Sequence, residues 1–228
     1  VELPVGTALD LSAYVTEREG YDFTGWYLDA ALTQPITSLT LEADTTVYAG
    51  WRIRNPFVDV AEKDYFYDAV LWGVENGVVK GMDETHFEPE TVCTRAQALT
   101  FLWRANGMPQ PKTTTNPFVD VDASAYYYDA VLWGVENGIV KGMDETHFEP
   151  DTACSRAHAL TFLWRAKGMP QASGTTFADV PANVYYAQAV AWGVENGIVK
   201  GMDETHFEPD TLCQRAHAVT FLWRAYAN

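Results

Sequence analysis

The chain has 228 residues, with 15 basic and 31 acidic side chains and therefore a formal net charge of −16. Such an acidic chain is not expected to bind nucleic acid or an anionic membrane surface, because both need a basic face. Hydrophobic residues make up 47% and aromatic residues 14%, which indicates folded domains rather than disorder. No apolar run approaches the roughly 20 residues of a membrane helix. The sequence opens at Val1 without an export-signal pattern, which fits a mature product or an excised fragment.

The first 53 residues have the pattern of a small β module. Residues 21–27, 37–42 and 45–51 alternate apolar and polar side chains and are rich in aromatic and β-branched residues. Gly, Pro and polar turns separate these segments. A module of this size buries little apolar surface, so we expect it to be marginally stable by itself.

Internal repeats organise the rest of the chain. The 18-residue segment 72–89 recurs at 133–150 and at 192–209, and one position changes, from Val78 to Ile139 and Ile198. Connectors rich in Pro, Gly, Ser and Thr separate the copies. We therefore expect a β module at residues 1–53 and repeats at residues 54–109, 115–170 and 174–228.

Each repeat has the pattern helix, loop, helix. The first copy predicts a helix over 68–76, a short extended piece at 78–79, a polar loop over 81–89 and a second helix over 95–105. The second helix carries an apolar stripe made of Ala96, Leu99 and Trp103. No single unit can bury such stripes alone. We therefore predict an α+β fold, mainly an α-helical pseudo-threefold assembly around a shared core with a small N-terminal β module, and expect a monomer.

The start of the second helix differs between the copies. The cap position holds Thr94, Ser155 and Gln214, and the position three residues later holds Gln97, His158 and His217. The first copy therefore has a full capping box, the second keeps its Ser cap, and the third has neither half. This series predicts that a binding site on the third copy is looser than those on the other two.

Basic residues are concentrated at a few repeated positions. Nine of the 15 Lys and Arg side chains occupy them: Lys80, Lys141 and Lys200; Arg95, Arg156 and Arg215; and Arg104, Arg165 and Arg224. Arg95 and its equivalents lie in the first turn of the second helix, where acidic residues are normally preferred. A cation there, beside free helix N–H groups, predicts an anion receptor. The alternatives are a surface ion pair with Glu88 or Glu90, or inheritance through recent duplication. Arg104 and its equivalents are expected to pack along the protein or pair with an acid, without binding a ligand.

A Lys-Gly-Met turn follows the first helix in every copy. Its glycines and methionines are Gly81, Gly142, Gly201, Met82, Met143 and Met202. Glycine lets a ligand approach the backbone closely, and methionine offers a soft apolar wall. The alternative is a tight turn that needs positive φ. The repeated tryptophans, at 72 and 103 in the first copy, either stack on sugars or, at this helical spacing, more readily join the core.

The remaining repeated reactive residues point away from catalysis. The cysteines, Cys93, Cys154 and Cys213, are odd in number and occupy one equivalent position, so we expect small buried hydrophobes rather than disulfides. The repeated His86 lacks the convergent ligands of a metal site and the third group of a nucleophilic pair. Asp83, Glu84 and Glu88 resemble paired catalytic carboxylates in composition alone. We expect no cofactor, no metal and no enzyme activity.

The repeated motifs F-x-D-V, W-G-V-E-N-G-[VI]-V-K-G and C-x-R-A-x-A-x-T-F-L-W-R-A resemble those of the surface-layer homology (SLH) family, in three tandem copies. The resemblance implies a three-pronged pseudo-trimer that anchors an exported protein to the wall of a Gram-positive-type bacterium, outside the cell. The implied ligand is a secondary cell-wall polysaccharide, often pyruvylated, and the implied receptor of its ketal carboxylate is Arg95, Arg156 or Arg215. The Lys-Gly-Met residues named above complete the predicted polysaccharide-binding set.

The N-terminal pattern G-Y-x-F-x-G-W-Y followed by T-V-Y-A-x-W resembles an internalin-type B repeat, a β-grasp-like module of extracellular adhesins. The usual leading strand of that module is missing from the pattern here. The alternative function for the whole chain is a protein-binding or self-assembling adhesin in which the repeats serve architecture alone.

Overall fold

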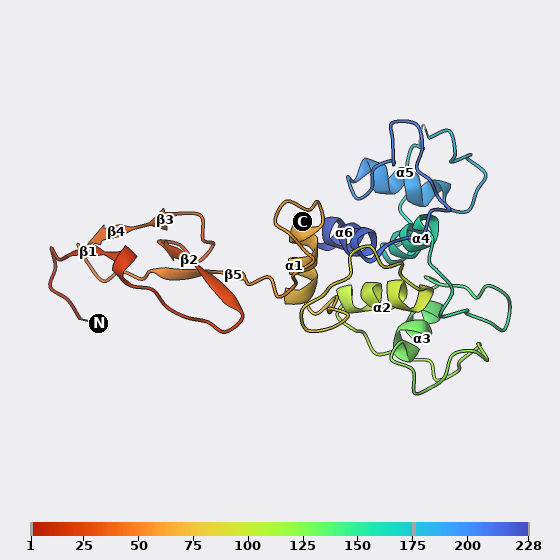
Figure 1. The fold of residues 1–228 in the computed structure, drawn as a ribbon, viewed down its shortest axis with the longest axis horizontal. Coiled ribbons are helices and arrows are strands. Elements are labelled where there is room, and N and C mark those ends of the chain that lie inside the picture. Colours follow the sequence, from red (N-terminus) through yellow and green to blue (C-terminus); the bar gives the residue numbers. More distant parts are fainter. Residues whose placement is uncertain (1, 175–176, 228) are drawn as a thin grey trace. The chain divides into compact units, whose positions relative to one another are not determined.

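The computed structural model describes residues 2–174 and 177–227, and the chain divides into two compact units, Val1–Asn55 and Pro56–Asn228 (Figure 1). Residue 1 of the predicted β module and residues 175–176 and 228 of the third predicted repeat lie outside the described residues. Within the described part, no helix is long and apolar enough to cross a bilayer.

The N-terminal unit consists of short antiparallel strands. β1 (Ala8–Asp10) pairs with β4 (Ser38–Thr40), and β2 (Tyr21–Tyr27) lies between β3 (Pro35–Ile36) and β5 (Tyr48–Ile53). A short 3₁₀ helix, η1 (Leu11–Ala13), follows β1 and is capped by the carboxylate of Asp10. The predicted strand at 21–27 is confirmed, whereas the segments at 37–42 and 45–51 form shorter or shifted strands.

An aromatic cluster holds the larger sheet. The ring of Phe23 packs edge-on against Trp26 at 5.4 Å and against Trp51 at 5.5 Å. Among the described residues of this unit, Leu11 and Gly50 are the ones that are fully buried. The unit therefore has a thin core, as its composition predicts.

The C-terminal unit is helical. Its elements are α1 (Tyr67–Glu75), α2 (Arg95–Ala105), α3 (Tyr128–Glu136), α4 (Arg156–Ala166), α5 (Ala187–Glu195) and α6 (Arg215–Tyr226). α2, α4 and α6 contact one another, as the centre of the helical unit in Figure 1 shows, and the remaining helices lie outside them. The second helix predicted over 95–105 is confirmed, and the first begins one residue earlier than predicted.

The helices exchange partners between repeats. α3 packs against α2 of the preceding repeat, α5 packs against α4, and α1 closes the ring by packing against α6. Gly73 permits this closure, because a Cβ there would lie 3.0 Å from Val219 of α6 and 2.7 Å from Val79. The pseudo-threefold prediction is confirmed, and the apolar stripe of each first helix is covered by a neighbouring repeat.

Backbone hydrogen bonds form a second ring at the start of the central helices. The amide of Cys93 donates to the carbonyl of Cys213 at 2.9 Å, that of Cys213 to Cys154 at 2.7 Å, and that of Cys154 to Cys93 at 2.8 Å. All of these cysteines are completely buried, as predicted. The ring fixes the N-termini of α2, α4 and α6 relative to one another.

The piece predicted as extended at 78–79 pairs with no strand. The amides of Val78 and Val79 both donate to the carbonyl of Gly73, at 2.7 and 3.0 Å, and so close the end of α1. The last carbonyl groups of a helix have no partners within the helix, so they need donors from the residues that follow. This role explains why residues 78–79 do not form the extended piece that the sequence predicts.

Candidate functional site

The repeated arginines at the start of the central helices are buried. Arg95 is 2% exposed, and Arg156 and Arg215 are each 3% exposed. The Nε of Arg156 donates to the carbonyl of Phe207 at 3.1 Å and its Nη2 to the carbonyl of Lys200 at 3.2 Å. The interpretation as a surface ion pair with Glu88 or Glu90 is therefore wrong, because backbone carbonyls of the next repeat hold the guanidinium.

The same pattern recurs around the ring. Arg95 donates to Phe148 and Lys141, and Arg215 donates to Phe87 and Lys80, through the same two nitrogens at 2.7–3.2 Å. In each case Nη1 has no hydrogen-bond partner among the described residues. It also keeps some exposed surface, because the fully buried side-chain polar atoms without a partner in that part of the chain are Nδ1 of His158 and Oγ1 of Thr161. Burial lowers the pKa of each guanidinium, although an arginine still carries its charge at neutral pH. Nη1 thus remains as an available charged donor.

The helix N-termini beside these arginines are not free. The amide of Arg95 donates to the carbonyl of Thr152 at 2.9 Å, and that of Ala96 donates to Pro150 at 3.0 Å. The equivalent amides of α4 and α6 donate to the loops of the following repeats in the same way. The prediction that these N–H groups receive an anion is wrong, because the loop before the next central helix already satisfies them.

A groove of about 340 Å³ opens over Arg156, and we call it the Arg156 groove. Its lining residues are Tyr65, Arg156, Lys200, Gly201, Met202, His217, Thr220, Phe221 and Arg224. Arg156 comes from the second repeat, the Lys-Gly-Met turn and α6 come from the third, and Tyr65 comes from the first. Among these described residues the lining includes cationic side chains and no carboxylate, which suits an anion despite the acidic total charge.

The residues at the equivalent repeat positions define, by correspondence with the Arg156 groove, an Arg95 groove and an Arg215 groove. The Arg95 groove combines Arg95 with Lys141, Gly142, Met143, His158, Thr161, Phe162, Arg165 and Tyr185, and the Arg215 groove combines Arg215 with Lys80, Gly81, Met82, Gln97, Thr100, Phe101, Arg104 and Tyr126. The guanidinium carbons of Arg95 and Arg215 lie 5.6 Å and 5.5 Å from the ring centres of Phe162 and Phe101. Each groove therefore needs all the repeats.

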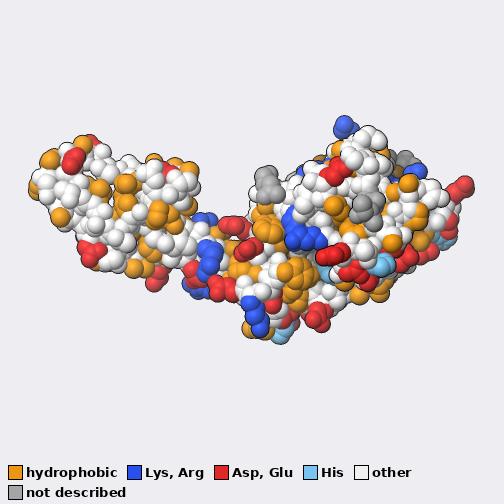
Figure 2. Space-filling view, turned by 90° about the horizontal axis from the view of Figure 1, so that it is seen from above, with side chains coloured by type: hydrophobic (Ala, Val, Ile, Leu, Met, Phe, Trp, Pro, Cys, Tyr) orange, Lys and Arg blue, Asp and Glu red, His pale blue; other side chains and the backbone are white. Residues whose placement is uncertain are grey.

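Figure 2 shows the distribution of charged side chains on one face of the helical unit. Acidic side chains are spread over it, whereas basic side chains form small separate groups. The amine-bearing side chains of Lys80, Lys141 and Lys200 are exposed, and only their backbone carbonyls serve the arginines. The lysines are thus free to approach a ligand.

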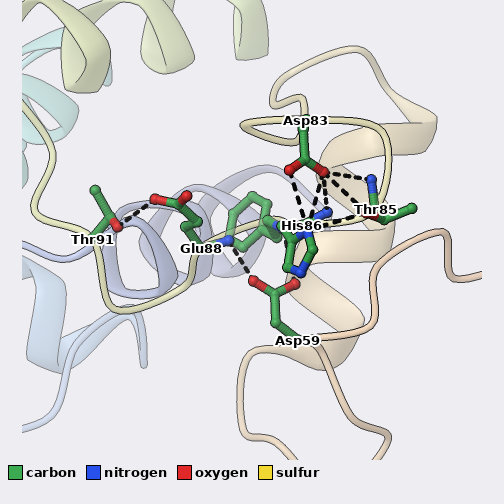
Figure 3. Close-up of polar contacts among 7 residues, drawn as sticks. Asp59, Asp83, Thr85, His86, Glu88 and Thr91 are labelled. Atoms are coloured by element: carbon green, nitrogen blue, oxygen red, sulfur yellow. Dashed lines mark hydrogen bonds and ion pairs between the residues drawn. The ribbon is translucent and has the colours of Figure 1, made fainter.

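An aspartate of the F-x-D-V motif fixes the carbonyl that receives each arginine. Asp59 accepts the amides of Phe87 and Glu88 at 2.9 and 2.7 Å, and Glu88, at φ 56°, accepts the hydroxyl of Thr91 at 2.8 Å (Figure 3). The carbonyl of Phe87 then accepts Nε of Arg215. Sequence reasoning missed Asp59, although its repetition as Asp120 and Asp179 was a usable signal.

The loop before this point is closed by its own acid. Asp83 accepts the amides of Thr85 and His86 at 2.7 and 2.8 Å, and its carboxylate faces the ring of His86 in Figure 3. These bonds, the one from Thr85 first, lower the pKa of Asp83 to about 2. Among the described residues, no group of three or more His, Cys, Asp or Glu side chains is arranged to hold a metal ion. The carboxylate of Asp83 therefore stabilises the conformation of its own loop.

The glycine of the Lys-Gly-Met turn is required by its own loop. None of Gly81, Gly142 and Gly201 has positive φ, so the interpretation as a positive-φ turn is wrong. A Cβ on Gly142 would lie 2.1 Å from the carbonyl oxygen of Asp144 and 2.7 Å from that of His147. Close approach of backbone to backbone thus excludes a side chain here.

The methionines and tryptophans separate into surface and core. Met82, Met143 and Met202 are 48–50% exposed at the groove edges. Trp133 and Trp192 are buried and Trp103 packs against the core, with its Nε1 donating to the carbonyl of Pro109 at 3.0 Å. The tryptophans are therefore core residues.

The helix caps differ from the prediction in one copy. The amide of Thr94 donates to Gln97 at 3.0 Å and the amide of Gln97 donates to Thr94 at 3.2 Å, which confirms the full box. In the third copy the amide of Gln214 donates to Nδ1 of His217 at 3.4 Å. The prediction that the third copy has neither half is wrong, since a histidine serves as the acceptor there.

Two groove elements were not predicted as binding residues. Tyr65 lies 91 positions from Arg156 in the sequence, and Arg224 donates to the carbonyl of Ile198 at 3.1 Å while lining the same groove. Burial raises the pKa of the equivalent Tyr185 to about 12, so its hydroxyl keeps its proton. The periodicity of one repeat could not reveal a residue that a different repeat supplies.

Comparisons with known proteins agree with this architecture. The chain matches the S-layer homology domain at residues 56–99, 117–160 and 176–219 and the Listeria-Bacteroides repeat domain at residues 3–50. It is similar to the surface-layer 125 kDa protein of Lysinibacillus sphaericus, 31% identical over 69% of this chain and 14% of that protein. It is also similar to the S-layer protein sap of Bacillus anthracis, 29% identical over 73% of this chain and 20% of that protein.

The resemblance extends to enzymes that carry such repeats. An amylopullulanase of Thermoanaerobacterium thermosulfurigenes is 25% identical over 77% of this chain and 10% of the enzyme. The chain thus spans no more than about a fifth of the length of these relatives.

A ring of interlocked helix pairs with grooves between repeats is the architecture of a repeat-built anchoring module. The chain belongs to the S-layer homology domain family, with a Listeria-Bacteroides repeat ahead of it. It is a cell-wall-anchoring module of a bacterial surface protein, located outside the cell.

Proposed function

We propose that the module anchors its protein by binding acidic sugar units of a secondary cell-wall polysaccharide in the grooves between repeats. The carboxylate, such as that of a pyruvate ketal, would dock on Nη1 of Arg95, Arg156 or Arg215. The observation that carries the proposal is the arrangement of these arginines. Two nitrogens of each are held by backbone carbonyls, which leaves the third nitrogen in a groove whose lining is cationic.

The physical argument rests on preorganisation. A guanidinium that already has a fixed orientation loses little conformational entropy when it binds a carboxylate. Charge-assisted hydrogen bonds are about twice as strong as neutral ones. The exposed Lys200 amine adds attraction at the groove edge, and Met202 and Tyr65 offer apolar surface to a sugar ring. Gly201 contributes through the shape of the turn, because no side chain fits there.

The test compares binding to wall polysaccharide before and after its ketals are removed by mild acid. We expect binding to the intact polymer and at least about 10-fold weaker binding to the treated polymer, because a charged hydrogen bond is lost. Equally strong binding to both polymers would contradict the role of the carboxylate, and no binding to either would favour an architectural, protein-binding module instead.

A charge-matched pair of variants locates the site. Replacing Lys80, Lys141 and Lys200 with Gln removes one cation from each groove edge, and we expect about 3-fold weaker binding. The control replaces Lys63, Lys112 and Lys167 with Gln, which changes the net charge equally outside the grooves. An equal loss in both variants would show that binding follows total charge and would contradict the groove proposal.

A further inference from the structure

The grooves differ in one respect that concerns hydrogen bonding. Two buried side-chain polar atoms have no hydrogen-bond partner among the described residues, Nδ1 of His158 and Oγ1 of Thr161. Both lie on α4, one helical turn apart, and both belong to the Arg95 groove. Their counterparts His217 and Thr220 line the Arg156 groove, which places the pair at the corresponding part of the Arg95 groove.

The counterparts of these two side chains in the other grooves all form hydrogen bonds within the protein. Thr100 and Thr220 donate their hydroxyls to the carbonyls of Ala96 and Ala216 at 2.7 Å. Gln97 and His217 accept backbone amides in the caps of their helices. Among the described residues, it is in the second repeat that a buried polar atom of each of these two side chains lacks a hydrogen-bond partner. Because an unpaired buried polar group destabilises the free protein, a ligand that supplies the partners gains affinity.

Two aromatic rings hold the ring of His158. It stacks on Tyr185 with ring centres 6.0 Å apart and on Phe162 at 6.5 Å, and it is only partly buried. Burial, with Arg95 and Arg165 nearby, lowers the pKa of His158 below that of an ordinary histidine. The ring is therefore neutral at neutral pH, with one nitrogen as donor and the other as acceptor.

Resting on the proposed function, we propose that His158 and Thr161 make the Arg95 groove the tightest of the sugar-binding grooves. They would pair with a neutral polar group, a hydroxyl or an N-acetyl group, of the sugar whose carboxylate binds Arg95. The ligand turns the partly exposed His158 ring and gains hydrogen bonds to both side chains. The other grooves bind the same carboxylate without this second contact.

The chain offers one reporter for each groove. Met143 lies in the Arg95 groove, Met202 in the Arg156 groove and Met82 in the Arg215 groove, and each is about half exposed. Methionine methyl NMR signals, followed during titration with a defined fragment of pyruvylated wall polysaccharide, therefore give a separate Kd for each groove. We expect the Met143 signal to saturate at the lowest ligand concentration.

The decisive variant is Thr161→Val. It should raise the Kd read from Met143 by about 3- to 10-fold, as for loss of one hydrogen bond, and leave the Kd values from Met202 and Met82 unchanged. It should also raise the Tm by about 2–4 °C, because it removes an unpaired buried hydroxyl. Thr161→Ser should restore the affinity. Thr220→Val removes a paired hydroxyl, so it should lower the Tm instead.

A second variant and a control keep the test independent of folding. His158→Gln gives the second repeat the residue of the first, and should weaken binding at Met143 by a similar factor. Thr114→Val makes the same chemical change in the linker and should alter no Kd. If neither Thr161→Val nor His158→Gln changes the Met143 Kd, the inference is wrong while the proposed function stands. If no methionine signal responds to the polysaccharide, the proposed function fails first.

Discussion

The two compact units of the chain are stabilised in different ways. In the β module the described residues bury little beyond Leu11 and Gly50, and the strands are short. In the helical unit a continuous core links all the repeats, and α1 closes the ring against α6. The comparison shows that repetition makes a large core from units too small to have one, provided that the ring is complete. The grooves proposed to bind sugar depend on that completeness, because each combines residues from all the repeats.

The largest expected effect comes from opening the ring. A chain that ends after Gly168 lacks α5 and α6. It therefore leaves α1 and the amide of Cys93 without their partners and removes two of the helices that pack against α4. We expect the cooperative thermal transition of the helical unit to disappear, measured by circular dichroism at 222 nm. The β module supplies the internal control, since its near-UV aromatic signal should persist. A truncated chain that still melts cooperatively near the Tm of the whole chain would contradict the closed ring.

The next effect concerns the turn at the groove edge. Gly142→Ala would bring a Cβ to 2.1 Å from the carbonyl oxygen of Asp144, and we expect the free energy of unfolding to fall by at least about 3 kcal/mol. Gly138→Ala is the control, because Gly138 has φ +65° with nothing within 4 Å of a Cβ. That change should lower stability by about 1–2 kcal/mol. Urea denaturation measures both, and equal losses would show that the turn relaxes freely.

The fold could be predicted from sequence as far as local signals reach. The capping box at Thr94 and the apolar spacing gave α2 correctly, and the single cysteine position indicated buried thiols. The pairing of α1 with α6 could not be predicted, because near-identical repeats offer the same apolar stripe to every possible partner. Only the three-dimensional ring closure decides which stripe is covered by which helix.

The candidate site was likewise predictable only where the signal lies within one repeat. The position of Arg95 and its equivalents stood out because a cation is unfavourable at a helix start. Its burial and its carbonyl acceptors could not be inferred, because they belong to the next repeat. Tyr65 and Asp59 contribute through contacts between distant parts of the sequence. Spacing within one repeat contains no information about such contacts.

A smaller, kinetic effect follows from the central ring of cysteines. Cys93 and Cys154 are fully buried, and burial raises the pKa of both thiols to about 12. We expect the native thiols to react with a chromogenic disulfide reagent at least about 100-fold more slowly than in the denatured chain, because the thiolate is the nucleophile. Thiols that react quickly in the native chain, with the helical signal intact, would show that the ring opens locally.

The smallest effect is the dependence of stability on mildly acidic pH. Burial lowers the pKa of His158 and of His217 in the folded chain. The unfolded chain therefore binds more protons, so stability is complete above the ordinary histidine pKa of about 6.5 and falls as the pH drops through the folded values. Thermal melts at pH 7.5 and 5 should show a smaller loss when both residues are changed to Gln. An unchanged pH profile in that variant would assign the loss to other groups.

The central claim is that a wall-sugar carboxylate docks on a buried arginine between repeats. A crystal structure of the chain soaked with a pyruvylated N-acetylmannosamine tests it most directly. The account predicts a carboxylate oxygen about 2.7–2.9 Å from Nη1 of Arg95 or Arg156, the length of a charge-assisted hydrogen bond, with the existing bonds to backbone carbonyls retained. A sugar bound elsewhere, with its carboxylate remote from every one of these guanidinium groups, would contradict it.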